Sequence, residues 1–392
     1  MKYVLPFSEN GFRRSPVVGL VAVAALALGL GACGSDAEPA PGAGASSAST
    51  GVLADEVAKL SEPLKSFPVP TEPIQGAEGL AGKTVYYIPI TQQAPAFTVT
   101  AAALTEALAV AGMKTQVCDG AANPSSIAAC VNQAVGAGAA GIVTDAIPYA
   151  MAANALDSAE KAGVPVLVAD QIPDPAHPAG DKLAYQEGAG TEMLEAVAKW
   201  IVVDSGGKAH VVLNQGTDNP SSIQYSKAAQ KVFADECPDC KVTVNAVNAA
   251  NFALIAPSTS SAILKTPGVN YVLSEFDIYL QPTIGGVQQA GKAAAVKGAS
   301  SAATLASLKM IANKNFLSAN AAQALPYQGW TLADAIMRMA LGQKVVELEV
   351  PFRLVTRDNI DDIDLTEKAE ASGEWFGPVE FKDQFRKVWG LS

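Results

Sequence analysis

Histidines and carboxylates are the side chains that could perform acid–base chemistry here, and few stand in a suitable pattern. His177 lies in a Pro-rich loop and His210 in an expected buried strand, and neither stands near a Ser, Cys or carboxylate motif. Both are better interpreted as hydrogen-bonded structural residues. Asp145 and Asp170 each end an expected strand and form the remaining pair that could act as acid and base. A hydrolase therefore stays an alternative that depends on this pair alone.

Motifs for phosphate or metal chemistry do not support an enzyme either. The run 136–141 has GxGxxG spacing, but it follows an expected helix and precedes a strand, whereas a phosphate cradle needs strand, glycines and then helix. The sequence contains no Walker A, GxSxG, HExxH or DxDxDG motif. We therefore expect no enzymatic activity, no cofactor and no metal.

Four cysteines, Cys118, Cys130, Cys237 and Cys240, form an even set that favours two disulfides in an oxidising compartment. Three connectivities are possible, of which local pairing of Cys118 with Cys130 and of Cys237 with Cys240 is the simplest. The Cys-Pro-Asp-Cys run at 237–240 could also be a redox dithiol or half a zinc site. It has no second ligand pair, so a structural disulfide is preferred.

The fifth cysteine, Cys33, follows an apolar run over 17–32 that has a basic flank and small residues at its end. This run is short and rich in Ala and Gly, which is typical of a signal peptide rather than a spanning helix. Leu30-Gly31-Ala32-Cys33 resembles the bacterial lipobox, in which the cysteine becomes lipidated; the alternative is an uncleaved signal anchor. We expect a signal peptide over 1–32 and a flexible tether over 33–51, which place the protein outside the cytoplasmic membrane.

Composition agrees with an exported protein. Charged residues make up 17% of the chain and the net charge is -11, so nucleic acid is not an expected partner. About 310 residues follow Leu80, which exceeds the size at which a single core keeps growing, and two lobes are expected.

Short β-rich runs alternate with Ala-rich helical stretches, the pattern of βαβ units in parallel sheets. The alternation stops and restarts, which predicts an α/β fold with two doubly wound lobes. The expected strands are 83–89, 114–118, 140–145, 164–169, 209–214, 241–247 and 271–274, and the expected helices are 97–111, 125–135, 149–161, 221–234, 257–264 and 282–290.

Several segments resemble the sugar-binding branch of type I periplasmic binding proteins of ABC importers, typified by ribose-binding protein. Val164–Asp170 resembles the family's strand that ends in a ligand-binding aspartate, and the match extends from about Lys83 to Val355. Further matching segments are Gly188 and Gly190, Tyr271–Asp277, Val287–Gly291 and Ala340–Lys344. The resemblance implies a first lobe over 81–187 and 324–352 and a second over 188–323 and 353–362, with a Pro-rich lead-in over 52–80 and a tail over 363–392.

The same resemblance implies a ligand site in the cleft, at the carboxyl ends of the strands. The ligand-binding residues carried over are Phe97, Asp145, Asp170, Gln171, Gln224, Tyr225, Phe252, Phe276, Ser300 and Gln323. Aromatic faces would take the apolar face of a sugar ring, while carboxylates and amides would bond its hydroxyls. Aromatic Tyr279, Tyr327 and Trp330 could contribute as well, or could pack between the lobes.

Gln171 and Tyr225 stand where the ribose-type pattern has arginines, so this pocket is expected to be more apolar than a pentose site. The resemblance implies a lipid-anchored, monomeric receptor that closes its lobes on a sugar-like molecule and delivers it to an ABC permease. Two alternatives remain: a nucleoside or aromatic solute in the same cleft, and a ligand sensor that signals to a membrane partner.

Overall fold

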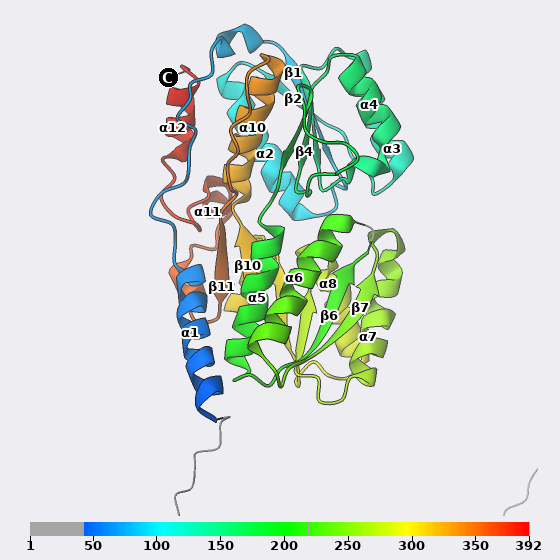
Figure 1. Ribbon diagram of the computed structural model, residues 1–392, viewed down its shortest axis with the longest axis vertical. Helices are drawn as coiled ribbons and strands as arrows, with labels where there is room; N and C mark the ends of the chain where they lie inside the picture. Colours follow the sequence, from blue (N-terminus) through cyan, green and yellow to red (C-terminus); the bar gives the residue numbers. More distant parts are fainter. Residues whose placement is uncertain (1–42, 218, 392) are drawn as a thin grey trace, which may run out of the picture. The chain divides into compact units, whose positions relative to one another are not determined.

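The computed structural model describes residues 43–217 and 219–391, and Gly44–Ser392 form one compact unit. The expected signal peptide and Cys33 lie outside the described residues. Two sheets, each covered by helices on both faces, make up the unit (Figure 1). The predicted α/β class with two doubly wound lobes is therefore confirmed. Among the described helices, none is both long and apolar enough to cross a membrane.

The first sheet is wholly parallel with strand order β2-β1-β3-β4-β5. Its strands are β1 (Thr84–Pro89), β2 (Lys114–Val117), β3 (Gly141–Asp145), β4 (Val166–Ala169) and β5 (Leu183–Gln186). Strand residues are buried on both faces: Tyr87 and Val143 contact one core and Tyr86 and Ile142 the other. Such continuous apolar runs are what a parallel sheet between two helical layers requires.

Four helices cover this first lobe: α2 (Pro95–Val110), α3 (Pro124–Gly136), α4 (Ala153–Lys161) and α10 (Leu325–Ala340). Figure 1 shows α10 beside α2, although the two are more than 200 residues apart in sequence. Gly329 allows this close approach, because a Cβ at that position would lie 2.5 Å from the Ala103 Cβ. The other face carries α3 and α4, and α3 begins at Asn123, whose side chain caps the helix as its Asn-Pro sequence indicates.

The second sheet has the order β11-β10-β9-β8-β6-β7, and β11 is its antiparallel strand. Its strands are β6 (His210–Gly216), β7 (Lys241–Val247), β8 (Tyr271–Ser274), β9 (Lys297–Ser301), β10 (Leu317–Gln323) and β11 (Phe352–Thr356). Helices α5 (Gly190–Asp204) and α6 (Pro220–Glu236) pack together, as do α7 (Ile255–Lys265) and α8 (Leu280–Gln289), while α9 (Leu305–Ala312) follows β9.

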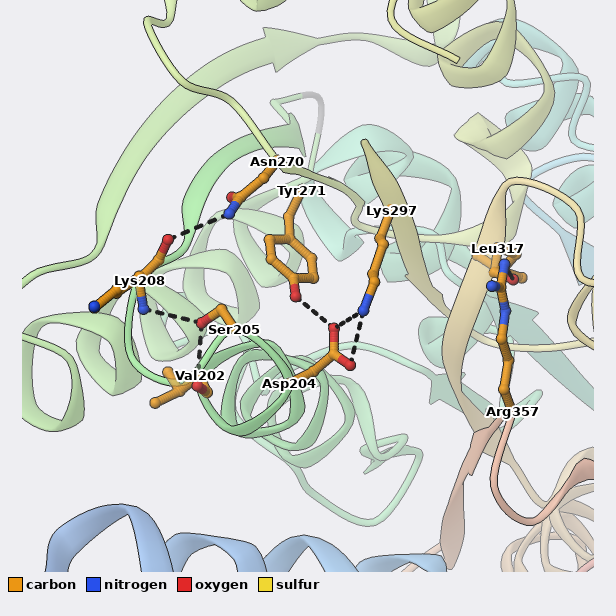
Figure 2. A network of polar contacts seen from close by, with 9 residues as sticks. All are labelled: Val202, Asp204, Ser205, Lys208, Asn270, Tyr271, Lys297, Leu317 and Arg357. Atoms are coloured by element: carbon orange, nitrogen blue, oxygen red, sulfur yellow. Dashed lines mark hydrogen bonds and ion pairs between the residues drawn. The ribbon is translucent and has the colours of Figure 1, made fainter. Parts of the chain in front are cut away.

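The edge of the second sheet at which β8 and β9 begin is closed by a polar network (Figure 2). Asp204, at the end of α5, accepts hydrogen bonds from the Tyr271 hydroxyl and from Lys297 Nζ, which lies 2.7 Å from Asp204 Oδ2. Tyr271 and Lys297 are the first residues of β8 and β9. The carboxyl ends of these strands are therefore at the opposite edge of the sheet.

The lead-in and the carboxyl-terminal tail pack onto the first lobe through aromatic side chains. Trp389 stacks on Trp330 of α10 with ring centroids 5.3 Å apart, and Phe67 of the lead-in stacks on Tyr327 at 5.0 Å. The Trp389 indole also donates to Asp334, 2.8 Å away. The tail forms α11 (Glu367–Ser372) and α12 (Phe381–Val388), and Phe381 and Phe385 of α12 are buried in the first lobe's core. Tyr327 and Trp330 are thus core residues.

Two differences from the sequence expectations have local causes. Helix α1 (Ala43–Ser61) starts inside the segment expected as a tether, because a helix that is already formed extends at little cost. Leu53 and Val57 of α1 are buried in the second lobe's core. Strands β5, β9, β10 and β11 were not among the strands predicted from the sequence. Strand β5 follows a Pro-rich loop, and β9 (Lys-Gly-Ala-Ser-Ser) and β10 (Leu-Ser-Ala-Asn-Ala-Ala-Gln) contain no β-branched residue.

The two local disulfides expected from the cysteine spacing are present. Cys118 pairs with Cys130 and Cys237 with Cys240. The histidines are also structural: His177 stacks on Tyr149 and bonds Asp174, and His210 Nδ1 lies 2.7 Å from the Pro267 carbonyl oxygen.

Candidate functional site

A cavity of about 150 Å³ lies between the lobes at the carboxyl ends of both sheets. The first lobe contributes Ile90, Thr91, Ala94, Pro95, Ala96, Phe97, Thr100, Ala122, Ala146, Pro148, Met151, Asp170 and Gln171. The second contributes Gly188, Gly190, Met193, Asn219, Ser222, Tyr225, Ala249, Phe276, Asp277, Ile278, Tyr279, Ala302, Thr304 and Gln323, and Leu325 begins the crossover helix α10. This position, outside the carboxyl ends of open α/β sheets, is where such folds bind ligands.

Backbone strain is concentrated around this cavity. Asp170, Ala146 and Ala302 each directly follow a strand and have φ values of 53°, 54° and 60°. Ala122, with φ of 49°, also lines the cavity. A residue with a Cβ pays about 1 kcal/mol or more in this left-handed region, and strain of this kind gathers at functional sites. The shared conformation turns the chain sharply after β3, β4 and β9.

Asp170 is the centre of a hydrogen-bond network at the hinge. Gln323, the last residue of β10, donates from Nε2 to Asp170 Oδ1 at 3.2 Å and accepts the Ala189 backbone N–H at 2.8 Å. Gly188 makes this contact possible, because a Cβ there would lie 1.9 Å from Asp170 Oδ1 and 2.8 Å from Gln323 Oε1. The network joins β4 of one sheet to β10 of the other across the hinge.

Asp145 lies behind Asp170 and does not line the cavity. It is fully buried at the end of β3, and the Tyr87 hydroxyl donates to its Oδ2 at 2.5 Å. Burial, followed by the charge of Asp170 and a hydrogen bond to it, raises the pKa of the Asp145 carboxyl well above its usual range. The protonated form is therefore favoured, which lets two acidic groups sit together without full charge repulsion.

Gln171 connects the two lobes directly. The Ser221 hydroxyl, at the start of α6, donates to Gln171 Oε1 at 3.1 Å, and Gln171 Nε2 donates to the Asp170 carbonyl. The same Ser221 oxygen accepts the Ile172 backbone N–H at 3.1 Å. The polar atoms of the Gln171 amide are thus bonded within the protein.

Tyr225 and Phe276 form an aromatic wall on the second lobe, in edge-to-face contact with centroids 6.3 Å apart. The Tyr225 ring lies against Gly190, where a Cβ would approach it to 2.4 Å. Its buried hydroxyl lies near Ser221 but has no hydrogen-bond partner at normal distance among the described residues. Burial raises the pKa of this hydroxyl, so Tyr225 stays neutral.

Asp277 is the second carboxylate of the cavity wall, and one of its oxygens is bonded within the protein. Asn320 Nδ2 donates to Asp277 Oδ1 at 2.7 Å, whereas Asp277 Oδ2 has no hydrogen-bond partner among the described residues. Burial raises the pKa of Asp277 to about 6. Ser300 lies beneath the cavity, within β9, and does not line it.

The structure therefore brings six of the ten expected ligand residues to the cavity: Phe97, Asp170, Gln171, Tyr225, Phe276 and Gln323. Asp145 and Ser300 lie behind its wall. Gln224 is exposed on α6, on a different helix face from its neighbour Tyr225, and Phe252 is 43% exposed in a 3-10 turn. None of the residues lining the cavity is basic.

Sequence reasoning missed most of the apolar lining. Ile90, Pro95, Met151, Met193, Ile278 and Leu325 belong to this group. Their shared signal was position, since each lies in the loop or the first helical turn that follows a strand. Apolar residues at such positions look like ordinary core residues in a sequence.

A family model described as periplasmic binding protein domain matches residues 85–344. The match covers more than half of the chain, which belongs to this family of two-lobed binding proteins, and the fold is that of its type I members. No curated relative matches the chain in sequence.

Solved structures share the fold at low sequence identity. A 5-methylthioribose transporter solute-binding protein from Thermotoga lettingae, in complex with 5-methylthioribose, is 18% identical with a TM-score of 0.66, over 81% of this chain and 99% of its own. A Bacillus halodurans ABC transporter solute-binding protein with bound myo-inositol is 16% identical with a TM-score of 0.62, over 72% and 97%. A Mycobacterium smegmatis protein in complex with β-D-fucofuranose is 15% identical with a TM-score of 0.63, over 74% and 96%.

Proposed function

We propose that this protein captures a small, sugar-like solute in the cavity between its lobes and delivers it to an ABC permease. The observation that carries the proposal is the Asp170 carboxylate at the hinge side of a cavity lined by both sheets. A carboxylate accepts hydrogen bonds from hydroxyls more strongly than a neutral group does. The solved relatives that carry sugars or polyols in the same fold support this solute class.

The residues proposed to contact the solute are the six that line the cavity. Asp170 accepts hydroxyl hydrogens, Gln171 and Gln323 hold Asp170 and the two lobes in place, and Phe97, Tyr225 and Phe276 pack on the apolar face of the solute. Both lobes contribute contacts, so a bound solute would stabilise the closed arrangement over an open one.

A binding role fits this site better than catalysis. The acid–base pair that a hydrolase would need is Asp145 with Asp170, but Asp145 lies behind the wall and bonds Tyr87. A reacting group would have to reach both carboxyls. We therefore propose a non-catalytic receptor.

A nucleoside or another aromatic solute is the second candidate. Tyr225, Phe276 and Phe97 give the cavity three aromatic walls that could stack on a base. Both candidates would use Asp170, so a ligand screen must include both classes.

A thermal-shift screen of the purified protein tests the proposal, with pentoses, hexoses, polyols, nucleosides and small aromatic acids. A ligand at a hundred times its dissociation constant adds about 2.7 kcal/mol to the free energy of unfolding. We expect stabilisation by a sugar or polyol, lost in Asp170→Ala and retained in Asp181→Ala, a matched exposed position. Stabilisation only by nucleosides would favour the second candidate, and stabilisation by none would reject both.

Delivery and membrane attachment need separate tests. Uptake of the identified solute by cells that lack the protein should be restored by the wild type and not by Asp170→Ala; restored signalling without uptake would instead indicate a sensor. We also propose that Cys33 is lipidated and holds the protein outside the membrane, a location that the two disulfides support. Cys33→Ser should then release the protein from membranes, and continued membrane retention would contradict the anchor.

A further inference from the structure

Polar and apolar groups occupy different sides of the cavity, as strand order shows. At the hinge, β4 and β10 supply Asp170, Gln171 and Gln323. Away from the hinge, the segments after β1 and β3 supply apolar side chains, among them Ile90, Phe97 and Met151. The cavity therefore has a polar side near the hinge and an apolar side toward β1 and β2.

Most polar side chains of the wall are already bonded within the protein. Gln323 uses its amide on Asp170, Gln328 and the Ala189 N–H, and Gln171 uses its amide on Ser221 and the Asp170 carbonyl. Thr91 accepts from the Gln93 N–H, Thr100 donates to the Ala96 carbonyl and Asn219 caps α6. Few groups remain for a ligand.

The wall groups with remaining capacity include the Asp170 carboxylate, Asp277 Oδ2 and the hydroxyls of Ser222 and Tyr225. Tyr225 is 4% exposed, and its hydroxyl has no partner at normal distance among the described residues. These groups can satisfy two or three ligand hydroxyls. A polyol with a hydroxyl on every carbon would leave others buried without a partner, at a cost of about 1–3 kcal/mol each.

The apolar side of the cavity favours a ligand that carries an apolar group. Met151 has a flexible thioether side chain that adapts to irregular apolar shapes, and Ile90 and Phe97 add further apolar surface. No basic side chain lines the wall, and Asp170 and Asp277 are both acidic. An anionic group would therefore have no counter-charge anywhere in the cavity.

We propose that the preferred ligand is an uncharged, two-ended molecule, with two or three hydroxyls on one side and an apolar substituent on the other. Within the proposed function, on which this inference depends, the class is a deoxy, alkyl or alkylthio sugar rather than a plain or acidic one. The hydroxyl end lies against Asp170 and Tyr225, and the substituent lies against Met151 and Phe97.

Isothermal titration calorimetry with two matched series tests this proposal. The first is ribose, 5-deoxyribose, 5-methylthioribose and ribose 5-phosphate, and the second is galactose, 6-deoxygalactose and galacturonate. We expect the apolar-substituted member of at least one series to bind at least tenfold more tightly than its parent sugar, and the acidic member to bind more weakly than the parent. Met151→Gln should reduce the preference for the apolar member severalfold, and Leu264→Gln, at an exposed position, should leave it unchanged.

The outcomes separate this proposal from the function on which it depends. Equal or tighter binding of the parent sugar, or tighter binding of the acidic member, would overturn the two-ended ligand and leave a sugar receptor. An unchanged preference in Met151→Gln would remove that residue from the apolar side. Binding of no member of either series would overturn the sugar-receptor function itself, and the two-ended sugar with it.

Discussion

The hinge side of the cavity and its apolar side differ in how firmly their side chains are held. Asp170 and Gln323 are hydrogen-bonded to each other and lie so close to Gly188 that a Cβ there would clash with both. Phe97 and Met151 are partly exposed and extend from the segments after β1 and β3 without polar contacts of their side chains. The side chains on the hinge side are therefore held in place before a ligand binds, whereas those on the apolar side can adapt to the shape of the ligand.

Gly188→Ala should have the largest effect on ligand affinity, because it disturbs the hydrogen-bonded hinge side of the cavity. Its Cβ would lie 1.9 Å from Asp170 Oδ1, so the carboxylate must leave its position. We expect the identified ligand to bind at least a hundredfold more weakly, about 3 kcal/mol, in calorimetric titrations. Gly180→Ala, where the Cβ would meet no atom within 4 Å, is the control. Unchanged affinity in Gly188→Ala would show that the hinge side adapts as well.

Asp277, which follows β8 in the wall of the second lobe, tests whether the wall away from Asp170 tolerates charge. Its folded pKa of about 6 exceeds the unfolded value of 3.8, so the folded state binds more protons in this interval. The Asp277 contribution to the free energy of unfolding should therefore fall by about 3 kcal/mol as pH rises from about 4 to above 6. Urea unfolding at several pH values should show Asp277→Asn gaining stability relative to the wild type over this range. If the free energies of unfolding of Asp277→Asn and the wild type changed in parallel with pH, the raised pKa of Asp277 in the folded state would be contradicted.

Asp170→Asn removes the charge of the hinge side and keeps its shape. A hydrogen bond to a charged group contributes more than one to a neutral amide, so affinity should fall about thirtyfold, or about 2 kcal/mol. Titration calorimetry on the identified ligand, with Asp181→Asn as the exposed control, measures the change. A smaller loss than in Phe97→Leu would reverse the ranking of the two sides.

Phe97→Leu should have the smallest effect, because the apolar side can adapt. The substitution removes part of one aromatic face, and we expect a loss of about 1 kcal/mol, less than tenfold in affinity. The loss should be larger for ligands with a bulky apolar group than for small ones. Equal losses for both would place Phe97 away from the substituent.

The sequence allowed the fold to be predicted where periodicity was strong and the site where a polar residue followed a strand. Asp170 stands directly after an apolar strand and lines the cavity. Asp145 stands one residue earlier and Ser300 two residues earlier relative to their strands, and the cavity wall there is formed by Ala146 and Ala302. A shift of one position moves a side chain from the wall into the layer beneath it, and no single-sequence pattern resolves that step.

Helical and irregular segments limited the prediction in other ways. Gln224 and Tyr225 are adjacent, but about 100° of helix rotation separates them, so Tyr225 lines the cavity and Gln224 is exposed. Phe252 lies in a 3-10 turn whose path depends on tertiary contacts rather than on local sequence. The tether prediction relied on composition, which does not reveal that Leu53 and Val57 anchor α1 on the second lobe.

The packing of α12 on the first lobe also bears on the order in which the protein folds. Phe381, Phe385 and Trp389 are buried in the same core as Tyr87 and Leu104, yet they follow the strands of the second lobe in the sequence. The amino-terminal lobe therefore cannot complete its core until the second lobe and α12 have been synthesised, although it begins first. We expect a chain ending before Phe381 to keep a protease-resistant second lobe and to lose protection in the first, so that the half made first matures last.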